Sequence, residues 1–491
     1  MTPSSAVADT DAAELERVLT AAYGSTARLA ASPPTERAGW LTAVADTLDA
    51  ASNRLLPLAA QESHLTEARL ASELARTTFQ LRLFGDTLRE GSFLQATIDH
   101  PDPAWPMGPR PDLRRTLRPI GPVAVYAASN FPFAFSVAGG DTAAAIAAGA
   151  PVVVKGSPGH PGLSQLTAEL VGRSLSNAGA PDGAFALVLG FEIGRTLVQD
   201  PRIAAASFTG SLAGGRALYD LAVSRDHPIP FYGELGSVNP AFVTPAAASA
   251  RAEEVGAGFL ASVSLGVGQF CTKPGFLFVP ESSTIPTIVK RLSADYPPAP
   301  MLNDHISQGY VERLVRLTGH PAVRRITGDI ADGSQQALTM LQTSTAELLA
   351  DPHELMVECF GPTAIIVTYA NEDELLAAAE AFDGQLTASI QGEQEDTVGR
   401  SLVELLTPVV GRLLWNGWPT GVSVTYAMQH GGPYPATTAA GFTSVGTTSI
   451  ERFLRPVSYQ GVPNSLLPPE VRDGNPWQIP QRVDGVLRLP S

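Results

Sequence analysis

The sequence predicts an α/β protein built on parallel sheets. Between Pro122 and Val223, short apolar stretches alternate with longer stretches of helical composition. Parallel strands that are buried on both faces appear as short apolar runs, and the connecting helices cover the sheet. A second, looser alternation follows Glu234. Because 491 residues are too many for one hydrophobic core, we expect several lobes.

Composition and charge narrow the class of protein. The net charge is -15, and no basic cluster offsets it, which argues against nucleic acid and anionic membranes as partners. Two cysteines cannot form a disulfide framework and fit a reducing compartment. Residues 1–11 lack a signal-peptide pattern, and prolines and glycines break the uncharged run at 119–140. We therefore expect a soluble, cytoplasmic protein.

The N-terminal region and the segment after it differ in character. Residues 11–91 should be helical, because Trp40, Val44 and Leu48 recur every four residues and a similar apolar face follows. Residues 100–119 are rich in proline and arginine and have no helical period. This segment should form an extended arm.

The main alternation follows the arm. The expected strands are 122–128, 151–155, 185–189 and 204–208, and the expected helices are 136–148, 163–177, 192–198 and 213–223. Ligands bind at the carboxyl ends of the strands in such sheets. The second lobe should hold a helix at 246–265, strands at 276–279, 364–369, 386–390 and 412–415, and a helix at 372–382. Residues 423–491 should be mostly loop and extended chain.

Cys271 is the candidate nucleophile. It lies in a glycine-rich stretch, residues 266–275, where a backbone can pass close to a ligand. A useful thiolate needs a partly exposed, electropositive or helix-end setting. The alternative is a small buried residue at a turn. We expect Cys359, in contrast, to be a packed thiol and not a second nucleophile.

Five further stretches strengthen the case for chemistry at Cys271. They are Ala128-Ser-Asn130-Phe-Pro132, Val154-Lys155-Gly-Ser-Pro158, Phe208-Thr-Gly210-Ser211, Gly233-Glu234-Leu-Gly236 and Glu358-Cys-Phe360-Gly-Pro362. In this order and spacing, together with the Cys271 stretch, they resemble the aldehyde dehydrogenase superfamily over roughly residues 118–418. The resemblance implies a Rossmann-like dinucleotide-binding domain, an α/β catalytic domain and a small oligomerisation arm.

The resemblance also assigns catalytic roles. Cys271 would attack the aldehyde carbonyl. The amide of Asn130 and the backbone N–H of Cys271 would stabilise the oxyanion. Glu234 would be the general base that activates water to hydrolyse the thioester. Because its sequence neighbours are apolar, we expect the pKa of Glu234 to be raised.

The cofactor implied by the resemblance is NAD or NADP. The pyrophosphate would lie at the helix that follows Ser211, where free N–H groups favour an anion. Residues 256–261 match a loose dinucleotide fingerprint, but they lie inside an expected helix and are not assigned to the cofactor. No pair of cysteine and histidine has metal-ligand spacing, so no metal is expected. The expected cofactor contacts are Lys155, Ser157, Gly210, Ser211, Leu235, Glu358 and Phe360.

Two departures from the family pattern are informative. Many relatives carry a glutamate where this chain has Pro158, and that glutamate binds the ribose 2′-hydroxyl. Its loss opens the site to a 2′-phosphate, so we expect a preference for NADP. Gly236-Ser237-Val238 replaces the usual Gly-Gly-Lys, which affects how Glu234 moves.

Three further stretches resemble one branch of the family and indicate the substrate. Residues 269–274, 430–437 and 452–457 look like the branch that contains NADP-dependent α-ketoglutaric semialdehyde (2,5-dioxopentanoate) dehydrogenases and bacterial long-chain aldehyde dehydrogenases. A dioic semialdehyde, which would give 2-oxoglutarate, needs cations or donors for its far carboxylate, and a fatty aldehyde needs an apolar tunnel. Lys273, His430 and Arg455 are the possible carboxylate partners.

The alternatives are a long-chain or broad-specificity aldehyde dehydrogenase and, more distantly, a thiol hydrolase or acyltransferase. The expected domains are a dinucleotide-binding domain with the N-terminal helices (1–97 and 119–236), a catalytic domain (237–425), and an arm with the C-terminal tail (98–118 and 426–491). Arms of this kind pair across subunits in the family resembled. We therefore expect a homodimer or homotetramer.

Overall fold

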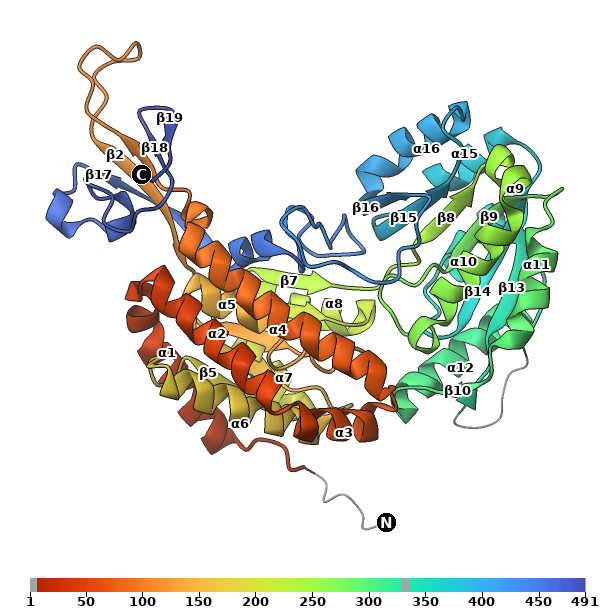
Figure 1. Ribbon diagram of the computed structural model, residues 1–491, viewed down its shortest axis with the longest axis horizontal. Coiled ribbons are helices and arrows are strands. Elements are labelled where there is room, and N and C mark those ends of the chain that lie inside the picture. The colour runs from red at the N-terminus through yellow and green to blue at the C-terminus, as the bar shows by residue number, and fades with distance from the viewer. Residues whose placement is uncertain (1–6, 329–334, 491) are drawn as a thin grey trace.

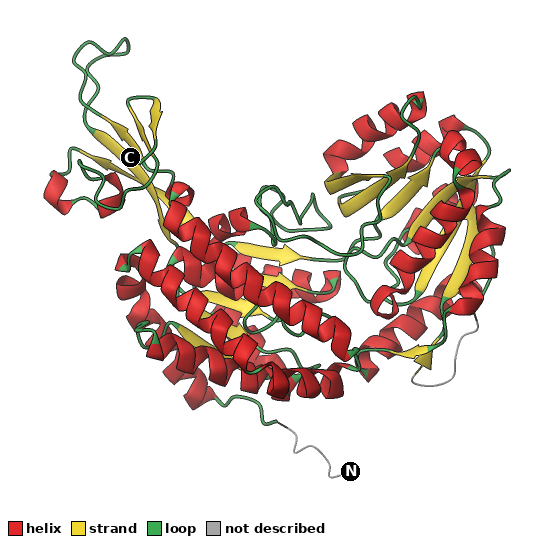
Figure 2. Ribbon diagram, in the orientation of Figure 1, coloured by secondary structure: helices red, strands yellow, loops and turns green. Residues whose placement is uncertain are grey.

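The computed structural model describes residues 7–328 and 335–490. It confirms an α/β fold with parallel sheets (Figures 1 and 2). The expectation about a signal peptide at residues 1–11 falls largely outside the described residues. The N-terminal region is helical, as the apolar periodicity predicts, in α1 (Ala12–Ala31), α2 (Pro34–Ala50), α3 (Ser52–Ser63) and α4 (Glu67–Glu90).

The first sheet has five parallel strands in the order β5-β4-β3-β6-β7. Its strands are β3 (Val123–Tyr126), β4 (Val152–Lys155), β5 (Phe185–Val188), β6 (Ala205–Thr209) and β7 (Phe231–Glu234). The helices between them are α5 (Gly140–Ala148), α6 (Pro161–Asn177), α7 (Phe191–Gln199) and α8 (Leu212–Val223). In Figure 1, α2 and α4 run across this lobe, and their apolar side chains share one core with β3 and β4.

The second sheet has seven strands in the order β11-β13-β14-β9-β8-β15-β16, all parallel except the β11–β13 pair. Its main strands are β8 (Pro240–Val243), β9 (Phe276–Pro280), β13 (Thr339–Ser344), β14 (Thr363–Tyr369), β15 (Gln385–Gln391) and β16 (Val410–Trp415), with β11 (Arg324–Arg325) at one edge. Two separate apolar cores form around this sheet.

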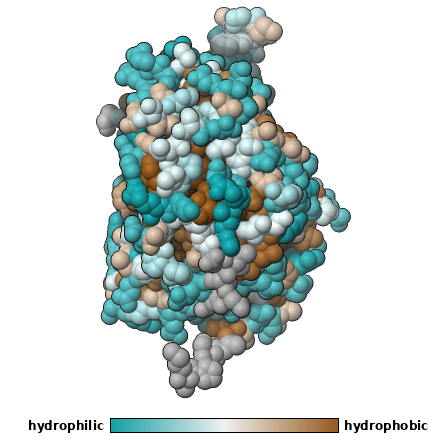
Figure 3. Space-filling view, turned by 90° about the vertical axis from the view of Figure 1, so that its right-hand side faces the viewer, coloured by the Kyte–Doolittle hydropathy of each residue, from teal (hydrophilic) through white to brown (hydrophobic). Residues whose placement is uncertain are grey.

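Helices cover the second sheet, and a small two-stranded pair, β10 (Ala299–Pro300) and β12 (Gln335–Gln336), lies beside it. The helices are α9 (Pro245–Ala250), α10 (Ala252–Ser264), α11 (Ile285–Leu292), α12 (Asp304–Gly319), α13 (Thr345–Ala350), α14 (Pro352–Leu355), α15 (Glu372–Glu380) and α16 (Thr397–Leu406). Figure 3 shows the outer side of this lobe as a mixed, mostly hydrophilic surface.

A third sheet forms the arm that projects from the first lobe (Figure 1). Its order is β17-β2-β1-β18-β19, and it joins strands from near the start of the chain to strands from its end. The strands are β1 (Thr97–Asp99), β2 (Leu113–Pro119), β17 (Leu454–Gln460), β18 (Gln481–Val483) and β19 (Val486–Arg488). The domain boundaries given above stay predictions.

Several elements differ from the sequence expectation. The helix expected at 246–265 is two helices, because Arg251 has φ -134° and interrupts the helical backbone between α9 and α10. The helix expected from 136 begins only at Gly140. Residues 256–261 lie inside α10, so they form no phosphate loop. Within the described ranges, no helix combines the length and apolar composition that a bilayer crossing requires.

Candidate active site

Cys271 lies in a tightly constrained loop between α10 and β9. Before it, Gly266, Val267 and Gly268 have φ values of 58°, 57° and 67°. This left-handed backbone suits glycine and is an outlier for the β-branched Val267. A Cβ on Gly268 would lie 2.1 Å from the carbonyl oxygen of Gly361, so glycine is required there. The loop is thereby pressed against the Gly361 backbone.

Asn239 fixes the other side of this loop. Its Nδ2 donates to the carbonyl oxygens of Cys271 at 2.8 Å and Lys273 at 3.0 Å. Its Oδ1 accepts from the hydroxyls of Ser237 at 2.9 Å and Thr387 at 3.0 Å. Ser237, which replaces a family glycine, therefore belongs to a buried network that holds the Cys271 backbone.

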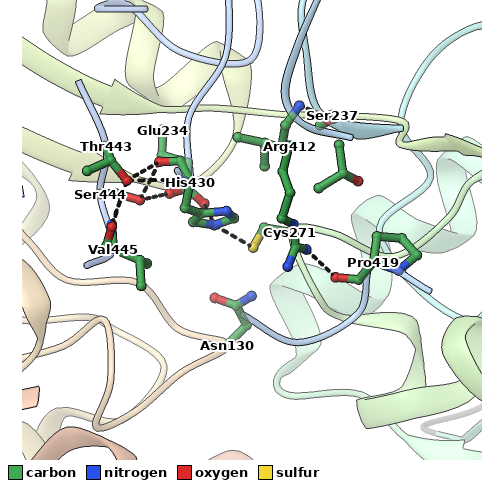
Figure 4. Close-up of polar contacts among 12 residues, drawn as sticks. Asn130, Glu234, Ser237, Cys271, Arg412, Pro419, His430, Thr443, Ser444 and Val445 are labelled. Atoms are coloured by element: carbon green, nitrogen blue, oxygen red, sulfur yellow. Dashed lines mark hydrogen bonds and ion pairs between the residues drawn. The ribbon is translucent and has the colours of Figure 1, made fainter. Parts of the chain in front are cut away.

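Glu234 and His430 lie next to the sulfur of Cys271 (Figure 4). The Nε2 atom of His430 is 3.5 Å from the Cys271 Sγ and 3.0 Å from Oε1 of Glu234. The hydroxyl of Ser444 donates to Oε2 of Glu234. His430 and Glu234 are buried, and Cys271 is half-buried. A carboxylate, an imidazole and a thiol thus meet in one place.

The C-terminal tail brings His430 and Ser444 to the site by pairing with β7. Glu234 forms an isolated β-bridge with Thr437, and the Leu235 N–H donates to the Ala436 carbonyl at 2.8 Å. His430 was expected only as a possible carboxylate partner, and that role stays a prediction; the structure shows instead that its ring faces Glu234 and Cys271. Ser444 and Asn239 were missed, since no local pattern distinguishes them.

The pKa values follow from this packing. Burial raises the pKa of the Cys271 thiol well above its usual value, and the charge of Glu234 raises it further, while Arg412 opposes both. Burial also acts to raise the pKa of Glu234, but contacts with His430, Ser444 and Cys271 outweigh it and leave that pKa lowered. The raised pKa expected for Glu234 is therefore wrong. Its side chain meets polar partners and not the apolar neighbours in sequence.

Asn130 follows β3 and lies beside Cys271. The side-chain Nδ2 of Asn130 donates to the backbone carbonyl oxygen of Gln269 at 3.0 Å. The backbone carbonyl oxygen of Asn130 accepts from Arg69 Nη2 at 2.7 Å. Figure 4 shows the amide group of Asn130 close to the sulfur. Because an amide nitrogen carries two N–H groups, one remains to donate to a substrate oxygen.

A cavity of about 440 Å³ opens on one side of Cys271. Ser211 caps the N-terminus of α8 there by accepting from the Gly214 N–H at 3.2 Å. Burial raises the pKa of Glu358 to about 7, and the charge of Lys273 opposes this. The cavity lining includes the expected cofactor residues Gly210, Ser211, Leu235, Glu358 and Phe360, together with Asn130, Glu234 and Cys271.

These residues suit a nicotinamide dinucleotide. A Cβ on Gly236 would lie 2.8 Å from Oε2 of Glu358, so the backbone leaves the carboxylate free to face the cavity. Lys155 and Ser157 lie at the carboxyl end of β4, outside this lining. The Ser157 hydroxyl is buried against the Ser129 hydroxyl at 2.8 Å. Their cofactor roles stay predictions.

A second cavity, of about 650 Å³, opens on the other side of Cys271. Residues from α4, the segment after β3 and the Cys271 loop line it. Lys273 is not part of the lining, because its Nζ is buried and donates to the Cys359 and Thr363 carbonyls. Arg455 lies on β17 in the arm. Neither is placed to bind a substrate carboxylate at Cys271.

The side chains of Glu234, Cys271 and His430 lie close enough together to act as ligands of one metal ion. Their ligand-type atoms all lie within 4.8 Å of one another. The expectation that no metal is needed stays a prediction.

Comparisons with known proteins agree with this arrangement. The family model described as "Aldehyde dehydrogenase family" matches residues 2–309. The chain is 43% identical over 96% of its length to the α-ketoglutaric semialdehyde dehydrogenase 2 of Azospirillum brasilense, 91% of which is covered. It is 42% identical, with the same coverage, to an α-ketoglutaric semialdehyde dehydrogenase of Acinetobacter baylyi.

Solved structures agree on the fold. The lactaldehyde dehydrogenase of Escherichia coli superposes with a TM-score of 0.77 at 21% identity and covers 92% of each chain. The resemblance predicted over roughly residues 118–418 is confirmed by the family model and by the two relatives, which match 96% of the chain. This chain belongs to the aldehyde dehydrogenase family.

Proposed function

We propose that this protein oxidises 2,5-dioxopentanoate to 2-oxoglutarate with NADP through a covalent Cys271 intermediate. The observation that carries the chemistry is the position of Cys271 between two cavities, with Glu234 and His430 beside its sulfur. The names of the two relatives at 42–43% identity support the substrate. A cytoplasmic location and a homo-oligomer are part of the same proposal.

The first half of the reaction forms and oxidises the adduct. Because burial and the charge of Glu234 raise the pKa of the Cys271 thiol, the thiol needs an adjacent base; the Glu234–His430 pair takes the thiol proton and passes it to solvent before hydrolysis begins. The sulfur then bonds to the aldehyde carbon, and the carbonyl oxygen takes the negative charge. The Asn130 amide and the Cys271 backbone N–H donate to that oxygen. A bound nicotinamide dinucleotide supplies the hydride acceptor.

The second half hydrolyses the thioester. Glu234 takes a proton from a water molecule, whose oxygen attacks the acyl carbon. The carbon–sulfur bond breaks, the carboxylate product leaves, and the sulfur is restored as thiolate. The low pKa of Glu234 keeps it ionised and ready to accept that proton near neutral pH. The Ser444 hydroxyl, which donates to Oε2, holds the carboxylate in place.

The catalytic roles are tested by variants assayed with and without coenzyme A. Cys271→Ala should lower kcat by at least about 10³-fold with every aldehyde. Glu234→Gln should slow hydrolysis and allow the acyl-enzyme to be trapped and seen by mass spectrometry. Product formation that requires coenzyme A would contradict the hydrolytic role of Glu234. Full activity in Cys271→Ala would overturn the mechanism.

The preference for NADP rests on Pro158, which is exposed after β4 and offers no carboxylate to repel a 2′-phosphate. We expect kcat/KM to be higher with NADP than with NAD. Pro158→Glu should reverse the preference, because its charge would oppose the phosphate. A large advantage for NAD in the natural protein would contradict this part of the proposal.

A long-chain aldehyde is the second candidate substrate. The second cavity, of about 650 Å³, which we call the substrate-side cavity, favours it in one respect, because much of its lining is apolar. A panel that includes a long-chain aldehyde and 2,5-dioxopentanoate, with reduction of the nicotinamide as the signal, separates the two. The apolar side chains in that lining include Leu65, Phe131, Phe135, Leu265, Val267, Phe270 and Val422.

A further inference from the structure

Helix α4 brings three charged side chains to the wall of the substrate-side cavity. Arg69, Glu73 and Arg76 all line this cavity, as Cys271 does. They recur at intervals of four and three residues, which places them on one face of the helix. An apolar tunnel for a fatty aldehyde has no need of buried charge, so the three residues call for a specific explanation.

The guanidinium group of Arg76 has an N–H donor that is not used within the described part of the protein. Its Nε donates to the Val422 carbonyl at 3.4 Å, and its guanidinium lies 5.4 Å from the centre of the Phe135 ring. Its Nη1 is buried without a hydrogen-bond partner among the described residues. Burial lowers the pKa of Arg76, while the charges of Glu73, Cys271 and Glu234 oppose that effect. The guanidinium therefore lies within electrostatic reach of the catalytic sulfur.

Arg69 supports the same end of the cavity. Its guanidinium lies 5.1 Å from the centre of the Phe131 ring and 4.6 Å from that of Phe270. One nitrogen donates to the Asn130 carbonyl, and Nη1 is buried with no hydrogen-bond partner within the described ranges. A Cβ on Gly266 would lie 2.8 Å from that Nη1, which places it against the Cys271 loop.

Glu73 does not cancel both positive charges. Its Oε1 accepts from the backbone N–H groups of Phe133 at 2.8 Å and Ala134 at 3.0 Å, which engages the carboxylate with the backbone. Its Oε2 is 3.9 Å from Arg69 Nη2. Two guanidinium groups thus face one carboxylate. The wall keeps a net positive charge even when Glu73 is ionised.

We propose that Arg76, assisted by Arg69, binds the far carboxylate of the semialdehyde while its aldehyde group reaches Cys271. The proposal rests on the oxidation of a carboxylate-bearing aldehyde proposed above. A half-buried guanidinium whose Nη1 is buried without an acceptor among the residues described is costly on its own, and a carboxylate supplies the missing acceptor and the opposite charge. The planar guanidinium group also suits two-point binding of a carboxylate. Arg69 has a positioning role as well, through the Asn130 carbonyl.

The test compares two aldehydes of equal chain length, 2,5-dioxopentanoate and pentanal, in four forms of the full-length protein. They are the natural protein, Arg76→Gln, Arg76→Lys and Arg82→Gln. Arg82 is the matched control, because it lies on the same helix and pairs with Asp46 and Asp49 at 2.7 Å on the surface. Steady-state KM and kcat are measured for both aldehydes.

We expect the natural protein to prefer 2,5-dioxopentanoate. In Arg76→Gln, KM for this substrate should rise, and the ratio of kcat/KM for 2,5-dioxopentanoate to that for pentanal should fall by about 10- to 100-fold. Arg76→Lys should retain part of the ratio, and Arg82→Gln should keep all of it. Equal losses with both aldehydes in Arg76→Gln, or a natural protein that prefers pentanal or a long-chain aldehyde, would overturn the proposal.

Calorimetry with 2-oxoglutarate separates this proposal from the proposed function. The natural protein and Arg82→Gln should bind 2-oxoglutarate, and Arg76→Gln should bind it at least about tenfold more weakly. A protein that reduces no nicotinamide with any aldehyde contradicts the proposed function, whereas binding of 2-oxoglutarate still decides the arginine site. Equal binding by Arg76→Gln and the natural protein would refute that site.

Discussion

His430 lowers the pKa of Glu234, the general base of the proposed reaction. Its Nε2 atom faces Glu234 and the Cys271 sulfur, and its contact is the largest of the effects that lower the pKa of Glu234. A lowered pKa leaves the carboxylate ionised, and therefore able to accept a proton, over a wider pH range. The imidazole thus counters the burial that would otherwise protonate the base.

Replacing His430 should shift the pH dependence of the reaction. In His430→Asn the lowering contact is lost, burial prevails, and the pKa of Glu234 rises. The acidic limb of the kcat profile should then move to higher pH, and kcat at pH 7 should fall on the order of 10-fold or more. The measurement is kcat from pH 5 to pH 9 in His430→Asn and in His353→Asn, a control at an exposed position on α14. An unmoved acidic limb would show that His430 does not act on Glu234.

The sequence identifies part of the site and not its electrostatics. Asn130, Glu234 and Cys271 each lie in a short stretch that could be recognised one by one, and the structure brings all three together. His430 could not be assigned in this way, because it is 159 residues from Cys271 and reaches it only through the tail that pairs with β7. The pKa of Glu234 was misjudged because neighbours in sequence are not neighbours in space.

At the scale of the element, the loop before Cys271 depends on the absence of a side chain at Gly268. Gly268→Ala would place a Cβ 2.1 Å from the Gly361 carbonyl oxygen in a left-handed backbone. We expect a loss of about 1–3 kcal/mol in the free energy of unfolding and a fall in kcat with every aldehyde. Denaturant unfolding and steady-state kinetics measure these two effects.

Gly172→Ala is the control for that substitution. Gly172 lies inside α6, and a Cβ there meets nothing within 4 Å. Because alanine is favoured over glycine in a helix, this variant should be as stable as the natural protein or up to about 1 kcal/mol more stable. If Gly268→Ala matched Gly172→Ala in both assays, the loop would not need its glycine.

The regular elements were the predictable part of the fold. Strands such as β3, β4 and β6 follow from short apolar runs, and α6 and α8 from the helical stretches between them. The break at Arg251 was not predictable, because the apolar pattern continues through it and the interruption comes from the backbone at one residue. α12 was missed altogether, since its apolar face is narrow: only Tyr310, Leu314 and Leu317 are buried.

At the scale of the whole molecule, the arm sheet ends in an exposed edge strand. β19 pairs with β18 on one side, and Val486 at its start and Leu489 just after its end are 62% and 72% exposed. Exposed strand edges with apolar side chains are places where another chain can pair. The homodimer or homotetramer stays a prediction, and this edge is where we expect the contact between subunits.

Adding charge to this edge should weaken the assembly. We expect light scattering to give the mass of a dimer or tetramer for the natural protein and a smaller mass for Val486→Lys/Leu489→Lys. Val315→Lys is the control, because Val315 is half-exposed on α12, outside the arm sheet. This variant should leave the mass unchanged. A monomeric natural protein would refute the expectation. An unchanged mass in the double variant would place the contact elsewhere.

The reach of the tail to β7 has a consequence for the growing chain. The nucleophile leaves the ribosome 159 residues ahead of the histidine that it contacts. At roughly 5–20 residues per second, this delay is on the order of 10–30 s. During that interval Glu234 and Cys271 exist without His430, so the lowered pKa of the base has not yet been established. A nascent chain therefore holds Glu234 and Cys271 before the contact that lowers the pKa of Glu234 can form, and that contact waits for translation of the tail.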